Sequence, residues 1–301
     1  MLKINKYAAI DIGSNAVRLL ISNIIEQDNE LVVFKKNSLV RVPIRLGADV
    51  FINGEISEYN KKRMLDTMMA FSLLIKSHGV ARYKACATSA MREASNSQAL
   101  SKDIFETTGI KIDIIDGEEE AAIIAATDLN TFIDPNKTYL YVDVGGGSTE
   151  FSIIHNGEKI KSKSFKIGTV RLLNDIVKNE TWQELESWIK ENTKDYYKIE
   201  LIGSGGNINK IFKISGKDLG KPLTYFYLTS YYKMLQSYSY EERITRLNLN
   251  QDRADVIIPA TRIYLSAMKW SGAKDIYVPK IGLSDGIIKS MYYETIPSVK
   301  V

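Results

Sequence analysis

Apolar residues along this chain recur at two different spacings, which alternate from one end of the sequence to the other. Short apolar runs bounded by Gly, Asn or Asp predict strands, and stretches with apolar residues three or four positions apart predict helices. Ser57 is a typical helix N-cap, and Met64, Met68, Phe71 and Ile75 after it form one helical face. Alternating strands and helices predict an α/β protein. In the first half, strands are expected within 7–23 and near 31–44, 82–87 and 110–115, and helices near 57–77, 96–107 and 117–126.

The pattern divides into two similar halves at Asp134-Pro135, a dipeptide typical of turns. At 301 residues, the chain is long enough for two ordinary domains, each with its own core. We therefore expect domains at 1–134 and 135–301, and the alternative that the last helix packs back on the first domain stays open. In the second half, strands are expected near 138–144, 150–155, 159–167, 200–202 and 275–278, and helices near 169–177 and 182–192, after 207, from 229, over 251–270 and from 284.

The two halves share one segment. YAAIDIGSNAVRLLISN at 7–23 returns as YLYVDVGGGSTEFSIIH at 139–155, with Asp11 matching Asp143. Each copy predicts a strand, a tight turn and a returning strand, with a carboxylate at the mouth of the turn. Glycines there let backbone N–H groups converge on an anion, because no Cβ blocks the approach. The repeat predicts two related domains that face each other across a cleft, each with a phosphate-binding loop.

Composition limits the function classes. The 40 basic and 36 acidic residues leave a net charge of +4, so no basic field for DNA is expected. Lysines at 159–166 fit a solvated face, and a guide path for a polyanionic substrate is the alternative. A single cysteine excludes an internal disulfide and a multi-cysteine zinc site. With no apparent leader and no membrane-spanning stretch, we expect a cytoplasmic protein without membrane contact.

Four motifs resemble one known family. DIGSN at 11–15, CATSAMREA at 86–94, IDGEEEA at 115–121 and VDVGGGSTEF at 142–151 look like the exopolyphosphatase / guanosine pentaphosphate phosphohydrolase family. Further similarity at 167–172 and 251–263 extends the resemblance over most of the chain. It implies two ribonuclease-H-like (actin-like ATPase) domains around a central cleft, within the acetate and sugar kinase, heat-shock chaperone and actin superfamily. The length is similar to the short, two-domain form of that family.

The resemblance assigns roles to individual residues. The last Glu of IDGEEEA, Glu120, corresponds to the family's general base, which aligns a water for attack on phosphorus. The alternative, first-turn acids that favour the helix dipole, suits Glu118 and Glu119 better. Asp143 and Glu150 offer hard oxygen ligands to Mg²⁺, with Asp11 joining through water. The expected phosphate-binding residues are Gly13, Ser14, Asn15, Arg92, Gly145, Gly146, Gly147, Ser148, Gly205 and Gly206.

A competing motif and three substitutions relative to the family pattern also bear on the function. Cys86 and Arg92 have the Cys-x5-Arg spacing of cysteine-dependent phosphatases, whose thiolate attacks phosphorus. No His precedes Cys86 and no Gly relaxes the loop, so a buried inert thiol is the better interpretation. Relative to the family pattern, Ala16 stands for a serine, and Ala122 and Ser284 stand for arginines.

The expected activity is Mg²⁺-dependent hydrolysis of the terminal phosphoanhydride of inorganic polyphosphate. The alternative within the same class is removal of the 5′ γ-phosphate of guanosine pentaphosphate. A small-molecule kinase and a non-catalytic polyphosphate or nucleotide sensor are alternatives of other classes. Homodimers are common in the family, although nothing in this sequence marks an interface.

Overall fold

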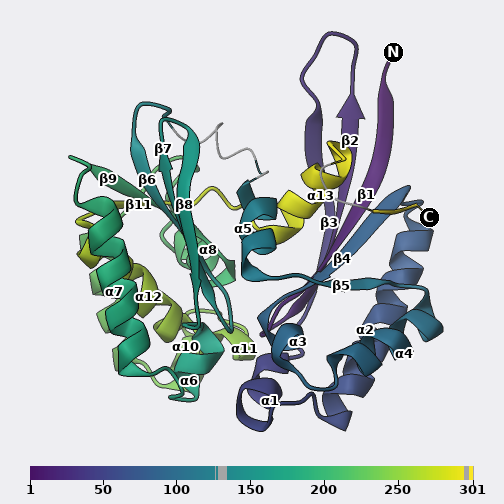
Figure 1. Ribbon diagram of the computed structural model, residues 1–301, viewed down its shortest axis with the longest axis horizontal. Coiled ribbons are helices and arrows are strands. Elements are labelled where there is room, and N and C mark those ends of the chain that lie inside the picture. The colour runs from purple at the N-terminus through teal and green to yellow at the C-terminus, as the bar shows by residue number, and fades with distance from the viewer. Residues whose placement is uncertain (126, 128–133, 295–297, 301) are drawn as a thin grey trace. The chain divides into compact units, whose positions relative to one another are not determined.

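The computed structural model describes residues 1–125, 127, 134–294 and 298–300. The chain forms two compact units, one of Met1–Thr127 with Leu283–Val301 and one of Asp128–Gly282. Each unit contains one mixed sheet with its own helices (Figure 1). No helix in the described part of the chain has the length and apolar character that a membrane span needs.

The sheet of the first unit has the order β3-β2-β1-β4, and both β5 and β12 pair with the outer side of β4. Strands β1, β2 and β3 are antiparallel to one another, whereas β4 runs parallel to β1 and β5 parallel to β4. The strands are β1 (Lys3–Ile12), β2 (Val17–Glu26), β3 (Val33–Val42), β4 (Arg82–Ala87), β5 (Ile112–Ile114) and β12 (Val299–Lys300), and the helices are α1 (Leu46–Asn53), α2 (Glu58–Ser77), α3 (Ser89–Glu93), α4 (Ser97–Thr108), α5 (Gly117–Ala125) and α13 (Leu283–Tyr292).

The sheet of the second unit repeats this arrangement in the order β8-β7-β6-β9-β11-β10. Three antiparallel strands again lie beside two parallel ones, which confirms the prediction of two ribonuclease-H-like domains. The strands are β6 (Thr138–Val144), β7 (Thr149–His155), β8 (Glu158–Phe165), β9 (Ile199–Ser204), β10 (Leu223–Thr224) and β11 (Asp275–Tyr277), and the helices are α6 (Thr169–Leu173), α7 (Asn179–Thr193), α8 (Gly206–Ile214), α9 (Tyr225–Ser237), α10 (Tyr240–Thr245), α11 (Gln251–Ala254) and α12 (Ile257–Ser271).

Strand β1 is buried on both faces, which explains its nearly continuous apolar sequence. Ala8, Ile10 and Ile12 point into the core that α2 covers with the apolar face predicted from the sequence. The intervening residues of β1 point to the opposite face, on which α13 packs (Figure 1). Asp11 therefore lies on the α13 face of the sheet and is almost fully buried.

Helix α13 belongs to the first unit, although it follows the second unit in sequence. It contacts β1, β2, β4 and α5, and Lys36 Nζ in β3 lies 2.8 Å from Asp285 Oδ1 in α13. The alternative left open for the predicted domain 135–301, that its last helix packs back on the first domain, agrees with these contacts, because the apolar face of α13 is buried against the first sheet. The predicted boundary adjoins residues 128–133, which lie outside the described residues, as does residue 126 at the end of the helix predicted from 117.

Four other elements differ from the sequence prediction. The helix expected over 251–270 is interrupted between α11 and α12. Helices α1, α3 and α10 were not expected, because all three are at most eight residues long and carry little periodic signal. For α10 a local signal does exist: Ser239 and Glu242 form a capping box.

The contact between α13 and α5 generates a prediction. A Cβ built on Gly286 would lie 2.2 Å from the backbone oxygen of Ile123, so Gly286→Ala forces the two helices apart. We expect a loss of about 1–3 kcal/mol in the free energy of unfolding, measured by urea denaturation. Gly282→Ala is the matched control, because a Cβ there meets nothing within 4 Å. Equal stability of the two variants would contradict this account of the packing.

Candidate active site

The first glycine loop joins β1 to β2. The N–H of Gly13 donates to the oxygen of Ala16 at 3.1 Å, which closes the turn. The carbonyl oxygens of the two intervening residues are bound from the α1 side: Gly47 N donates to Ser14 O at 2.8 Å, and Arg45 N donates to Asn15 O at 3.0 Å. The loop carbonyls are thus held by the protein. Because the carbonyl and the following N–H of a trans peptide point in opposite directions, the N–H groups face away from α1.

A side-chain contact fixes the same loop to α3. The hydroxyl oxygens of Ser14 and Ser89 lie 2.9 Å apart and both residues are buried. The carboxylate of Asp11 is paired with Arg18, whose Nη1 donates to Oδ2 at 2.8 Å. The register of β1 and β2 places these two residues directly opposite each other. The mouth of the first loop therefore carries an ion pair, and the metal role predicted for Asp11 stays a prediction.

The second glycine loop joins β6 to β7 with the same turn. Gly145 N donates to Ser148 O at 3.0 Å, and a Cβ on Gly145 would lie 2.9 Å from that oxygen. The predicted equivalence of the two repeats is thus visible in their backbone hydrogen bonds. In the described part of the chain, the N–H groups of Gly146, Gly147 and Ser148 have no backbone acceptor. Convergent N–H groups of this kind suit an oxygen anion.

The third glycine turn lies beside the second loop. Strand β9 ends at Ser204, and Gly205 has φ 111°, a conformation that favours glycine. A Cβ on Gly205 would lie 2.9 Å from Val144 O and 3.3 Å from Asp143 Oδ1. Gly205 therefore lies beside the Asp143 carboxylate, and its phosphate-binding role stays a prediction. Gly206 follows as the first residue of α8, whose N-terminus starts next to the Asp143 carboxylate.

Asp143 and Glu150 are the strongest metal-ligand candidates. They are cross-strand partners in β6 and β7. Glu150 is only 3% exposed, and its Oε1 accepts hydrogen bonds from Ser148 Oγ at 2.6 Å and from Ser164 Oγ at 3.0 Å. No group of three or more His, Cys, Asp or Glu side chains that could hold a metal ion occurs among the described residues. Two carboxylates fit Mg²⁺, which commonly combines one or two protein carboxylates with waters and substrate phosphates.

The three consecutive glutamates of α5 have different surroundings. Glu119 Oε2 accepts a hydrogen bond from Asp116 N at 3.1 Å, and Asp116 Oδ1 accepts from the N–H groups of Glu118 and Glu119. Glu118 and Glu119 are exposed, so the helix-start interpretation suits them. Glu120 alone is buried, at 9% exposed. This contrast supports the choice of Glu120 among the three, and its catalytic role stays a prediction.

Arg92 connects two of the predicted motifs. Its Nη1 donates to the backbone oxygen of Ile115 at 2.7 Å, just before the α5 turn that carries Glu120. One of the five guanidinium N–H donors thus holds the turn in place. The predicted contact of Arg92 with phosphate would use the remaining donors.

Cys86 lies in the core of the first sheet and is fully buried. Burial raises the pKa of its thiol to about 12, and the nearby Lys84 lowers it only in part. At pH 8 only about one thiol in 10,000 would be ionised at such a pKa. The inert reading of the Cys-x5-Arg spacing agrees with this environment.

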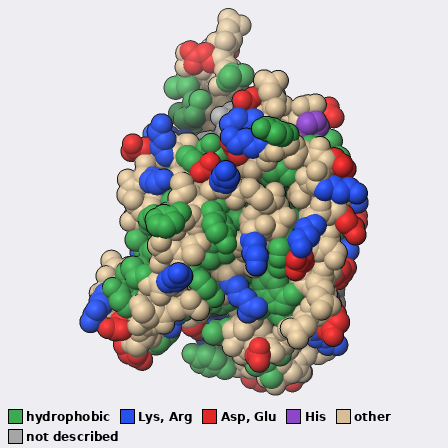
Figure 2. Space-filling view, turned by 90° about the vertical axis from the view of Figure 1, so that its left-hand side faces the viewer, with side chains coloured by type: hydrophobic (Ala, Val, Ile, Leu, Met, Phe, Trp, Pro, Cys, Tyr) green, Lys and Arg blue, Asp and Glu red, His purple; other side chains and the backbone are tan. Residues whose placement is uncertain are grey.

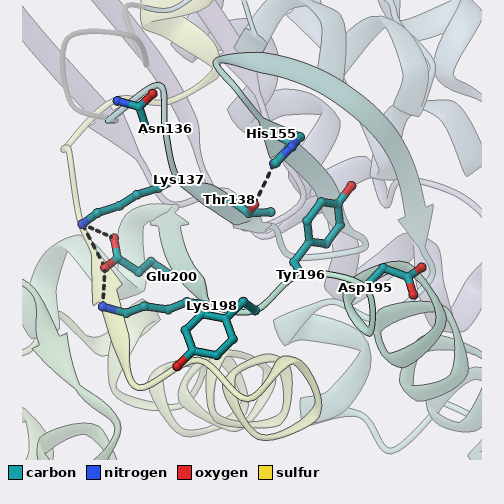
Figure 3. Close-up of a pocket in the computed structure, with 9 residues that line it drawn as sticks. Asn136, Lys137, Thr138, His155, Asp195, Tyr196, Lys198 and Glu200 are labelled. Atoms are coloured by element: carbon teal, nitrogen blue, oxygen red, sulfur yellow. Dashed lines mark hydrogen bonds and ion pairs between the residues drawn. The ribbon is translucent and has the colours of Figure 1, made fainter.

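A cavity of about 330 Å³ lies elsewhere in the second unit, near the start of β6 (Figure 3). Lys137 Nζ is 3.1 Å from Glu200 Oε1, and Lys198 Nζ is 3.6 Å from the same oxygen. Asp195 also lines the cavity, so two cations face two carboxylates and no net positive charge results. The length of β6, about 20 Å, separates it from the glycine loop. The cavity therefore offers little electrostatic attraction to a polyanion.

Surface charge gives no further guide to the site. Figure 2 shows Lys and Arg side chains interspersed with acidic and neutral ones over the face it presents. The lysines of β8 project from an edge strand, and one of them, Lys163, pairs with Glu184 at 2.7 Å. The expected solvated face fits these residues better than the alternative, a continuous basic path.

Comparison with known proteins identifies the family of the chain. The model of the Ppx/GppA phosphatase family matches residues 24–294, a range that includes Glu120 and the second glycine loop. The chain belongs to the Ppx/GppA phosphatase family. The resemblance inferred from the sequence motifs is thereby confirmed.

Relatives of this chain are named for different activities. The chain is 36% identical over 217 residues to a bifunctional 3-dehydroquinate synthase/phosphatase of Fusobacterium nucleatum, covering 66% of this chain and 32% of that one. It is 31% identical over 174 residues to a guanosine-5′-triphosphate,3′-diphosphate pyrophosphatase of Photobacterium profundum, covering 58% of this chain and 34% of that one. The chain therefore spans about a third of the length of these two relatives.

The fold matches a solved structure over nearly the whole length of both chains. The crystal structure of an exopolyphosphatase from Cytophaga hutchinsonii covers 96% of this chain and 98% of its own, with a TM-score of 0.81 and 24% identity. This likeness shows that both chains share the two-sheet fold.

Four residues near the loops were missed as site residues in the sequence: Arg18, Arg45, Ser164 and Arg171. Arg18 follows DIGSN closely, and pairing of the two repeats would have placed it opposite Asp11, as Glu150 is opposite Asp143. Ser164, Arg45 and Arg171 reach the loops from segments distant in sequence. For Arg171 the family resemblance at 167–172 was an available signal, whereas no local pattern signals the contacts of Ser164 and Arg45.

The environment of Cys86 predicts its reactivity. Native protein treated with iodoacetamide at pH 8 should remain unlabelled, because the thiol is buried and neutral. Unfolding in guanidinium chloride should restore labelling, as mass spectrometry would show. Cys86→Ser should keep the phosphate-releasing activity of the parent protein. Loss of that activity in a variant that is still folded would support Cys86 as the nucleophile.

Proposed function

We propose that this protein is a Mg²⁺-dependent hydrolase that removes the terminal phosphoryl group from inorganic polyphosphate. Membership of the Ppx/GppA phosphatase family supports the reaction class. The observation that carries the proposal is the second glycine loop, where backbone N–H groups lie next to the Asp143 and Glu150 carboxylates. This combination suits a phosphate together with a divalent cation.

In the proposed mechanism the loop N–H groups and Arg92 bind the non-bridging oxygens of the terminal phosphoryl group. Glu120 orients a water and accepts its proton as the new P–O bond forms, while the shortened chain leaves with the electrons of the broken P–O bond. Asp143 and Glu150 would hold Mg²⁺, which when bound offsets the negative charge of the phosphate oxygens. Ser148 and Ser164 orient the Glu150 carboxylate through their hydroxyl hydrogen bonds.

A second substrate uses the same groups. The Photobacterium relative is named for guanosine-5′-triphosphate,3′-diphosphate, and its 5′ γ-phosphate is also a terminal phosphoanhydride. The two substrates differ in what lies beyond the first phosphates. A kinase would instead transfer phosphate from ATP to a small acceptor, and a sensor would bind polyphosphate without releasing phosphate. We also propose that the protein acts in the cytoplasm.

Purified protein separates these functions. Phosphate release should be measured with polyphosphate and with guanosine pentaphosphate, each with and without Mg²⁺. We expect release from polyphosphate to exceed that from the nucleotide and to vanish with EDTA, because the metal offsets the charge of the phosphates. Equally slow phosphate release from both substrates would contradict both hydrolase activities. Tight polyphosphate binding without phosphate release would favour a sensor.

Glu120 provides the mechanistic test. Glu120→Gln keeps the size of the side chain but cannot accept a proton, so kcat should fall by a factor of about 10² to 10⁴. Glu118→Gln is the matched control, because Glu118 is exposed on the same helical turn. The pair is compared by phosphate release from polyphosphate. Unchanged kcat in the Glu120 variant would remove this residue from the mechanism.

A further inference from the structure

All three glycine carbonyls of the second loop are bound by one short segment at the start of α6. Thr169 N donates to Gly145 O at 3.0 Å, and Val170 N donates to Gly146 O at 2.8 Å. The third carbonyl, Gly147 O, accepts from the side chain of Arg171, with 2.7 Å between Nε and O. Two of these bonds use backbone N–H groups, and the third depends on one side chain.

The loop and the α6 segment are in close contact. A Cβ built on Gly168 would lie 2.3 Å from Gly146 O and 2.5 Å from the carbonyl carbon of Gly147. Only glycine at position 168 allows the two backbones to approach this closely. The first turn of α6 is therefore the support against which the loop rests.

The carbonyl bonds determine where the loop N–H groups point. In a planar trans peptide, the C=O of one residue and the N–H of the next are antiparallel. Binding of Gly147 O by Arg171 thus directs the N–H of Ser148 to the opposite side. The same reasoning applies to Gly146 N–H and Gly147 N–H, whose peptide planes are fixed by Thr169 and Val170.

The first loop provides an internal comparison. Residue for residue, Asn15 matches Gly147, and Asn15 O accepts from the backbone N–H of Arg45 at 3.0 Å. Arg45 adopts a left-handed conformation, φ 64°, to present that N–H. In the second loop no backbone N–H binds the third carbonyl among the described residues, and the Arg171 guanidinium occupies that role.

We propose that Arg171 is a positioning residue for the second phosphate loop, which turns the Gly147–Ser148 peptide so that the Ser148 N–H faces a bound terminal phosphate. The proposal rests on the proposed function for the identity of the ligand. Arg171 acts through the loop, so its substitution should weaken phosphate binding and leave the proton transfer at Glu120 unaltered.

Kinetics test the role. Arg171→Ala should raise KM for polyphosphate about tenfold, equivalent to about 1.4 kcal/mol, with a much smaller change in kcat and an unchanged pH profile. Arg171→Lys should behave like the alanine variant, because an ammonium ion keeps the charge but not the planar Nε–H. Guanidinium ion at low millimolar concentration should restore part of the affinity of Arg171→Ala.

Arg243→Ala is the matched control. Arg243 Nε also donates to a backbone oxygen, that of Ser239 at 3.3 Å, but in α10. Its loss should change neither KM nor the response to guanidinium. Full activity of Arg171→Lys would show that charge alone is used, and would overturn the positioning role.

A measurement without substrate separates this inference from the proposed function. In ¹H–¹⁵N spectra of the full chain, the Gly147 and Ser148 amide signals should shift or broaden in Arg171→Ala and stay unchanged in Arg243→Ala. Unperturbed signals in Arg171→Ala would refute the inference even if the protein hydrolyses polyphosphate. Perturbed signals in a protein that releases no phosphate would uphold the loop geometry and reject the hydrolase.

Discussion

In an antiparallel hairpin each residue faces one partner on the next strand, and a slip by one position would turn all side chains to the other face. The register of the two repeated hairpins places Asp11 opposite Arg18 in one unit and Asp143 opposite Glu150 in the other. The same backbone geometry thus presents an ion pair in one loop and two carboxylates in the other. The proposed binding of Mg²⁺ at the second loop depends on this register.

The two loops obey a second constraint, which comes from the peptide plane. Carbonyl groups repel a phosphate and N–H groups attract it, so a loop that binds anions must turn its carbonyls into the protein. Segments distant in sequence do this in both units: residues 45–47 for the first loop and 168–171 for the second. Glycine is needed where backbones touch, as at Gly168, and where φ is positive, as at Gly205.

The departures from the family pattern can be weighed against these constraints. Ala16 occupies the place of Ser148 in the repeat and still closes the turn, because the bond from Gly13 uses its backbone oxygen. The first loop therefore keeps its shape without a hydroxyl group. Ala122 is exposed on α5, two residues after the buried Glu120, and so lies on a different face of the helix. Nothing in the structure explains Ser284.

The sequence alone determined the α/β class, the repeated hairpins and the glycine turns, because strand periodicity and glycine conformation are local properties. Its choice of Glu120 rested on motif position, and only folding distinguished it from Glu119 by burial. The return of α13 to the first sheet and the bond from Arg171 to Gly147 O were decided by tertiary structure. Contacts between distant segments depend on how helices cover sheets, which no local spacing specifies.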